Sequence, residues 1–153
     1  MTLDLYATHV SKLLDGVLAY HKELHALDIP AARGVIRELE HLAREMEDTR
    51  INPSLQDSLR MMFETQIPPL TMIADALEQE LHQPAYGNIV TAKAYLSALK
   101  EFMEQGQNAH AAEVLALTEP LIKSIRDERF RHPVLLANKR EIEDRYTKLR
   151  SAF

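Results

Sequence analysis

Apolar residues recur at alternating spacings of three and four through residues 3–27, the pattern of a heptad seam on one long helix. The seam consists of Leu3, Tyr6, Val10, Leu13, Val17, Tyr20, Leu24 and Leu27. A second row, Leu14, Leu18, His21 and His25, follows about 100° further round the helix. This helix therefore has two sides to cover. We expect helices of the same chain to cover the first side, and a further internal helix, another subunit, a partner protein or a metal to cover the second.

Capping residues and prolines divide the first half of the chain into further helices. Asp28 is placed as the N-cap of a helix over 29–48, joined to the first helix by a turn so short that the two should lie antiparallel. Asn52 is the next N-cap. Two consecutive prolines, Pro68 and Pro69, then require a bend or a new helix.

The second half repeats this organisation after a break at residues 83–88. A helix is predicted over 89–105, with Gly106 as its C′ residue and Asn108 as the N-cap of the next helix. Pro120 interrupts that helix, for which one kinked helix is favoured over two separate ones. A last helix follows His132 and Pro133.

These segments predict an all-α protein. No stretch alternates polar and apolar residues over the length of a strand, and β-branched residues never cluster. A chain of 153 residues is about one domain. We therefore expect a single domain, 1–153, built as a bundle of six to seven mostly antiparallel helices with short connections. If the chain has two halves, they meet near 83–88.

Composition excludes several classes of function. The chain contains no cysteine, which rules out disulfides, cysteine-ligated metals and thiol catalysis. It also lacks the glycine-rich phosphate loops and the serine nucleophile elbow of common enzymes. The first residues carry an acid where a signal peptide carries basic residues, and no apolar run reaches the length of a membrane span. We expect a cytoplasmic protein that does not bind membranes.

Charge is distributed unevenly along the chain. Residues 123–153 carry nine Lys and Arg against five Asp and Glu, a net charge of +4, whereas residues 1–122 carry nine against eighteen, a net charge of −9. A solvated helix face with local ion pairs is the favoured interpretation. The alternative is binding of nucleic acid or of an acidic protein through residues 123–150, although glycine, tryptophan and the interleaved aromatic residues of single-strand stacking platforms are missing.

Histidines at helical spacing raise the question of a metal site. His21 and His25 are four residues apart and project from one side of a helix, as two ligands of a metal do. His41 with Glu45, and Glu78 with His82, repeat this spacing. His41 and Glu45, however, lie on the solvent side if Leu39 points inward. The favoured interpretation is polar histidines beside a packed helix, with no cofactor; a metal-binding bundle that uses His21 and His25 is an alternative.

A second candidate lies in the basic segment, where five residues separate Arg126 from His132. This spacing resembles the R-x4–6-H motif of HEPN-type ribonucleases, which are small helical bundles and often dimers. The resemblance covers seven residues. It implies phosphate binding by Arg126 and general base catalysis by His132, acting across a dimer.

Weighing these patterns, we expect a non-enzymatic protein-binding or regulatory helical module. Its partner is another protein or a second copy of the chain, and the row of Leu14, Leu18, His21 and His25 is the predicted binding surface. Three methionines, Met61, Met62 and Met72, fit an adaptable binding surface as well, but core packing is the favoured use. The HEPN-like ribonuclease and the metal-binding bundle are the alternative functions.

Overall fold

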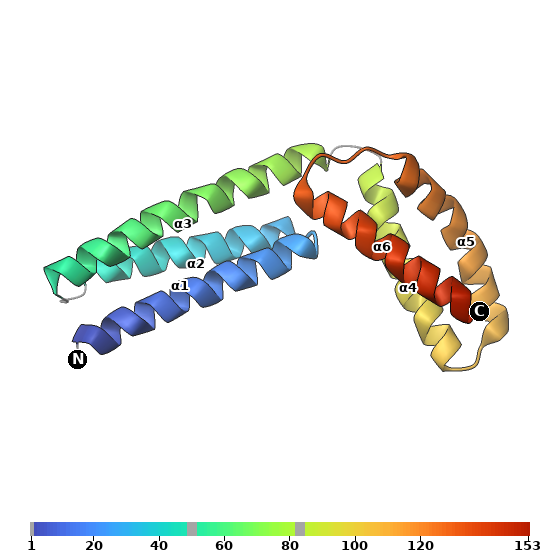
Figure 1. Ribbon diagram of the computed structural model, residues 1–153, viewed down its shortest axis with the longest axis horizontal. Helices are drawn as coiled ribbons and strands as arrows, with labels where there is room; N and C mark the ends of the chain where they lie inside the picture. Colours follow the sequence, from blue (N-terminus) through green and yellow to red (C-terminus); the bar gives the residue numbers. More distant parts are fainter. Residues whose placement is uncertain (1, 49–51, 82–84) are drawn as a thin grey trace. The chain divides into compact units, whose positions relative to one another are not determined.

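The computed structural model describes residues 2–48, 52–81 and 85–153, and six α-helices and no strand occur within them. The predicted all-α class is confirmed. Figure 1 shows the helices in chain order: α1 Thr2–His25, α2 Ile29–Asp48, α3 Pro53–Glu80, α4 Ala85–Glu104, α5 Asn108–Asp127 and α6 Pro133–Ala152. They form two compact units, one within residues 1–78 and one within residues 79–153.

A tight turn joins α1 to α2, as predicted. The N–H of Leu27 donates to the carbonyl of Leu24 (2.9 Å) and that of Asp28 to the carbonyl of Glu23 (3.0 Å), the two bonds of a Schellman motif. Leu27 has φ of 63°. Asp28 then caps α2 through Oδ1, which accepts from the N–H of Ala31 at 3.1 Å.

The first two helices approach closely at Gly16. A Cβ built on Gly16 would lie 2.4 Å from Cδ2 of Leu39, a side chain that is 3% exposed. A larger residue at position 16 would therefore displace the Leu39 side chain or move α1 away from α2. This contact fixes which side of α1 faces α2.

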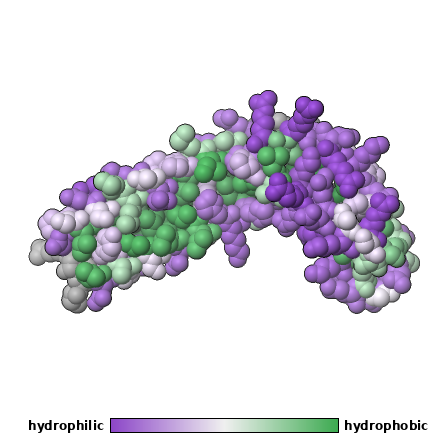
Figure 2. Space-filling view, in the orientation of Figure 1, coloured by the Kyte–Doolittle hydropathy of each residue, from purple (hydrophilic) through white to green (hydrophobic). Residues whose placement is uncertain are grey.

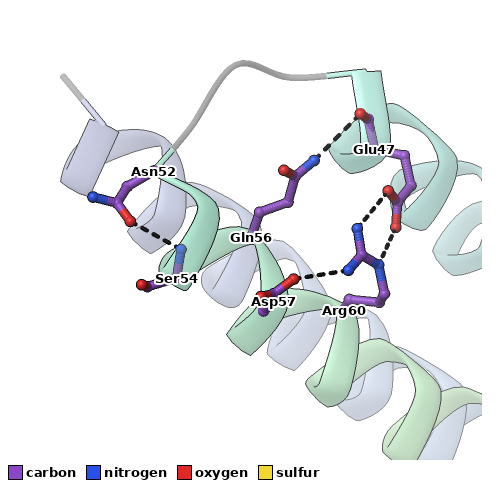
Figure 3. A network of polar contacts seen from close by, with 6 residues as sticks. All are labelled: Glu47, Asn52, Ser54, Gln56, Asp57 and Arg60. Carbon is purple, nitrogen blue, oxygen red and sulfur yellow. Dashed lines mark hydrogen bonds and ion pairs between the residues drawn. The ribbon is translucent and has the colours of Figure 1, made fainter.

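A polar network holds the beginning of α3 to the end of α2 (Figure 3). Nε and Nη2 of Arg60 donate to the two carboxylate oxygens of Glu47 (2.7 and 2.9 Å), and Nη1 donates to Asp57 (2.8 Å). Asn52 caps α3 as predicted, since its Oδ1 accepts from the N–H of Ser54 at 2.9 Å. These groups are largely exposed, so each contributes little to stability, but together they connect the end of α2 to the beginning of α3.

The prediction of a new helix at Pro68 and Pro69 is wrong, because α3 continues through both prolines (Figure 1). Both lie on the exposed side of the helix, and the carbonyls that lose their usual N–H partners belong to Glu64 and Thr65, which are exposed too. Water can satisfy those carbonyls. The chain therefore stays helical through both prolines without the two missing hydrogen bonds.

The second unit also begins with a hairpin. Gly106, at φ of 72°, ends α4 as predicted, with its N–H donating to Met103 O (3.2 Å) and that of Gln107 to Phe102 O (2.9 Å). The prediction of Asn108 as N-cap is wrong: Gln107 holds that position and makes no side-chain cap bond. The helix α4 already begins at Ala85, so the predicted break is shorter than 83–88; residues 83 and 84 lie outside the described residues.

The prediction of one continuous helix through Pro120 is confirmed by α5. The last helix, α6, is capped by His132, whose Nδ1 accepts from the N–H of Val134 at 3.1 Å. The carboxylate of Glu80 accepts from the backbone N–H groups of Arg131 and His132, the latter at 2.8 Å. The core of this unit is aliphatic and fully buried: Ile89, Leu96, Leu99, Ile122, Ile125, Leu135 and Ile142.

Candidate partner-binding face

The second apolar row of α1 lies on the surface. Leu14 is 58% exposed, Leu18 is 68% exposed, and His21 and His25 are exposed as well. We call these four residues the outer row. Leu3, which was predicted to belong to the core seam, is also exposed. The helices of the first unit therefore leave the outer row uncovered.

Three contacts fix the rotation of α1 that leaves this row outside. Gly16 lies against Leu39 of α2, as described above. The hydroxyl of Tyr20 donates to the carbonyl of Leu70 in α3 at 2.6 Å, within a fully buried environment. The hydroxyl of Tyr6 lies 3.4 Å from that of Ser58, also in α3. These contacts hold the inner side of α1 against α2 and α3 and turn Leu14 and Leu18 outward.

Burial also affects the chemistry of Tyr20. Its side chain is 0% exposed. Because the charged phenolate would lose its hydration there, burial raises the pKa of Tyr20 from 10.0 to about 12. The neutral hydroxyl is therefore the form that fits the core, and it donates to Leu70 at ordinary pH.

The third helix also has an uncharged side. At 100° per residue, all charged side chains of α3 in the first unit fall within a sector of about 60°. That sector faces α2, since Arg60 binds Glu47, and Asp75 and Glu78 bind Arg33. The other flank is uncharged and consists of Ser58, Met61, Met62, Thr65, Met72 and Ile73.

Two of the methionines on this flank are on the surface. Met61 is 69% exposed and Met72 is 71% exposed, so the prediction that they pack in the core is wrong for these two. Met72 follows Met61 by eleven positions, about three helical turns, which places both on one side of α3. We call the outer row of α1, Leu3 and this flank the α1–α3 face. Figure 2 shows hydrophobic surface gathered over α1–α3, while the surface of α4–α6 in the same view is mostly hydrophilic.

The candidate metal ligands are not brought together. No group of three or more His, Asp or Glu side chains within the described ranges could hold a metal ion. His21 packs edge-on against the ring of Tyr20, with centroids 5.2 Å apart. His41 and Glu45 point to solvent, as predicted, and pair with each other at 3.2 Å. Glu78 binds Arg33, and His82 lies outside the described residues.

The two residues of the ribonuclease-like motif have different surroundings. Arg126, near the end of α5, lies 3.5 Å from a carboxylate oxygen of Glu143 and over the ring of Tyr146. His132 is 8% exposed and caps α6. Each residue therefore has a structural role. Catalysis by the pair stays a prediction.

The basic segment forms the local contacts expected of a solvated face. Nζ of Lys139 donates to the carbonyls of Arg126 and Glu128, at the end of α5, where a cation also complements the helix dipole. On α4, partial burial lowers the pKa of Lys93, which has Glu141 and Arg145 of α6 nearby. Nucleic-acid binding through residues 123–150 is neither supported nor opposed by these contacts.

Sequence reasoning found Leu14 and Leu18 but missed the flank of α3. The sequence does contain a signal for this uncharged side. When residues 53–80 are drawn as one helix through both prolines, the charged residues of the first unit fall on one side of it. Comparison of the chain with models of protein families, with curated proteins and with solved structures gave no match. None of the helices described is long and apolar enough to cross a membrane.

Proposed function

We propose that this chain is a non-enzymatic protein-binding module that works through its α1–α3 face. One observation carries the proposal: Leu14 and Leu18 remain more than half exposed on a helix whose other side is packed in a core. Contiguous apolar surface of this kind is typical of protein interaction sites. The exposed methionines of α3, Met61 and Met72, are flexible and polarizable, which suits a surface that adapts to a partner.

The shape of the face favours a helical partner. Leu14 and Leu18 are four residues apart, and Leu3 lies eleven residues before Leu14, so the three align on one side of α1. Helical ligands bind such surfaces through residues at the same spacing.

The test is a double substitution, Leu14→Glu with Leu18→Glu. Both side chains are already exposed, so we expect the helical content and the thermal midpoint to change little, while partner binding is lost. The measurement is circular dichroism together with capture of binding partners by the immobilised chain. Leu117→Glu is the matched control, because Leu117 lies in α5 and is also 58% exposed.

Two results would count against the proposal. Unfolding of the double variant would show that the outer row belongs to the core. Equal capture by the double variant and the wild-type chain would show that partners bind elsewhere.

A further inference from the structure

A groove lies between α1 and α2, separate from the α1–α3 face. We infer that it binds an amphipathic helix of another protein, one whose apolar stripe is flanked by Lys or Arg. The groove has a volume of about 410 Å³, and residues 12–19 of α1 and 35–45 of α2 line it. Its apolar lining consists of Gly16, Ala19, Val35, Leu39 and Leu42.

The groove is on the side of the α1–α2 hairpin that α3 leaves open. The third helix contacts α2 through Arg33 and Glu47. Glu38 and Leu42, which line the groove, lie about 140° or more round α2 from both of these residues. Among the described helices of the first unit, α3 therefore covers one side of the hairpin and none covers the other.

The shape of the groove suits a helix. It follows two neighbouring helices for about two turns, and a further helix laid along it would complete a four-helix arrangement. Gly16 and Ala19 have small side chains or none, so they leave room for side chains of a partner. Since a cavity of about 150 Å³ holds a benzene ring, a groove of about 410 Å³ has room for large apolar side chains of that helix.

Two carboxylates on opposite rims of the groove select the charge of the partner. Gly16 of α1 lies against Leu39 of α2, and the two helices are antiparallel (Figure 1). Asp15 and Glu38 are therefore offset by only about 3 Å along the helix axes. Neither carboxylate forms an ion pair within the described part of the chain. A cation placed between them would be attracted by both.

The other charges around the groove leave it acidic. Lys12 is the one cation among the lining residues, against the carboxylates of Asp15, Glu38 and Glu45, a net charge of −2 with His41 neutral. His41 lies 3.2 Å from Glu45. Residues 1–78 as a whole carry seven Lys and Arg against thirteen Asp and Glu, a net charge of −6. The whole unit therefore attracts a basic partner toward the groove.

The first experiment titrates the full chain with a synthetic helical peptide of about 20 residues, built from Leu, Ala and Lys with its leucines in one stripe. A control peptide has Glu in place of every Lys. We expect the Lys peptide to bind with a Kd on the order of 10 µM at low salt, and the Glu peptide at least roughly tenfold more weakly. Fluorescence anisotropy measures both. Equal affinities, or no binding of the Lys peptide at roughly 1 mM, would overturn the inference.

Charge variants test the two carboxylates. Asp15→Lys with Glu38→Lys should weaken binding of the Lys peptide at least roughly tenfold and strengthen binding of the Glu peptide. The matched control is Glu40→Lys with Glu64→Lys, the same change of charge at two exposed positions outside the groove. An equal loss in the two double variants would show that only the net charge matters, and would overturn the assignment to the groove.

A further variant tests the groove without changing charge. Ala19 is exposed, so Ala19→Trp should keep the helical content measured by circular dichroism, while the indole fills the groove and weakens peptide binding roughly tenfold. Leu14→Gln with Leu18→Gln in the outer row is the control and should leave peptide binding unchanged. The reverse result would place the peptide on the α1–α3 face and overturn the inference, while the proposed function would stand. Unchanged capture of other proteins by the outer-row variant would count against the proposed function alone.

Nuclear magnetic resonance locates the peptide without any substitution. On addition of the Lys peptide, the methyl signals of Val35, Leu39 and Leu42 should shift, because these side chains line the groove. Those of Ile122 and Ile142, buried in the second unit, should stay in place. Shifts confined to the second unit or to α3 would overturn the inference.

Discussion

The two hairpins of this protein use the same turn with different residues. Both α1 and α4 end in a Schellman motif, with Leu27 at φ of 63° in one and Gly106 at φ of 72° in the other. The left-handed conformation costs a residue with a side chain about 1 to 2 kcal/mol and costs glycine nothing. The first hairpin therefore carries a strain that the second avoids.

Burial explains the difference. Leu27 is 8% exposed, so its side chain contributes about 2 kcal/mol of apolar burial, enough to offset the strain of the turn. A Cβ on Gly106 would meet nothing within 4 Å, so a larger residue there would gain no contact. A left-handed position accepts leucine where the core is close, and it requires glycine where the turn faces solvent.

The two units also differ in what they leave on their surfaces. The first unit gathers the charges of α3 on the α2 side and exposes an uncharged face (Figure 2). In the second unit, charged side chains cover α6, where Arg126 pairs with Glu143 and Lys139 binds the end of α5. The surface of α1 and α3 is therefore better suited to bind an apolar partner surface than that of α6.

The largest difference that we expect between the units is in how their buried tyrosines make the free energy of unfolding depend on pH. Tyr20 keeps its proton to a pKa of about 12, whereas an unfolded chain loses it near 10. Above pH 10 the unfolded state therefore binds fewer protons, and the free energy of unfolding falls as pH rises, by about 2 to 3 kcal/mol at pH 12. Urea unfolding between pH 9 and 11.5 measures this loss.

Tyr20→Phe should remove that pH dependence and lower stability by about 1 kcal/mol at neutral pH, because the bond to Leu70 is lost. Tyr146→Phe in the second unit is the control. It also removes a hydroxyl from a buried ring, one that donates to Glu119 at 3.3 Å, but it keeps Tyr20. An unchanged alkaline profile in Tyr20→Phe would contradict the assignment.

The next largest difference is expected between glycine substitutions in the two units, measured as the free energy of unfolding. Gly16→Ala forces a Cβ against the packed side chain of Leu39, and we expect it to lower the free energy of unfolding by about 2 kcal/mol. The Cβ of Gly87→Ala in α4 would meet nothing within 4 Å, so this substitution should stabilise the chain by about 0.5 to 1 kcal/mol, the gain in helix propensity. Equal thermal midpoints for the two variants would show that α1 and α2 can adjust to the added Cβ at residue 16 without loss of stability.

Substitutions in the two turns should have smaller effects on stability, for different reasons in each turn. Gly106→Ala should cost about 1 kcal/mol through strain alone. Leu27→Gly should also cost about 1 kcal/mol, because relief of strain recovers only part of the lost burial. Thermal unfolding of both variants measures the balance. Stabilisation by Leu27→Gly would mean that its burial contributes less than the turn costs.

The smallest effects on stability are expected on the exposed face. Leu14→Glu with Leu18→Glu should change the free energy of unfolding by less than about 0.5 kcal/mol, as should Leu117→Glu in the second unit. The two variants should differ only in partner binding. A loss of several kcal/mol in the first variant alone would place its leucines in a core.

The sequence predicted those features that are encoded locally. Asp28, Asn52 and Gly106 act through their own neighbouring backbone, and their roles as caps could be predicted from residue type and spacing. Periodicity also separated Leu14 and Leu18 from the core seam. That prediction needed only the geometry of one helix.

Features that depend on distant contacts were missed or misjudged. The need for glycine at position 16 arises from Leu39, on another helix. Met61 and Met72 are apolar and were assigned to the core, but their side of α3 has no described helix against it. The continuity of α3 through its prolines depends on solvent reaching Glu64 and Thr65, which propensity rules do not consider. Binding by the face, too, depends on a partner that the chain alone does not name.

The double proline in α3 gives that helix an uneven resistance to unwinding. Residues 68 and 69 have no amide hydrogen, and two hydrogen bonds that would tie residues 64 and 65 to the following turn are absent. The middle of α3 therefore has fewer backbone hydrogen bonds than the segments on either side of it. Amide exchange should then divide α3 into two blocks, 53–67 and 70–80, that open with separate free energies although the helix is continuous in shape.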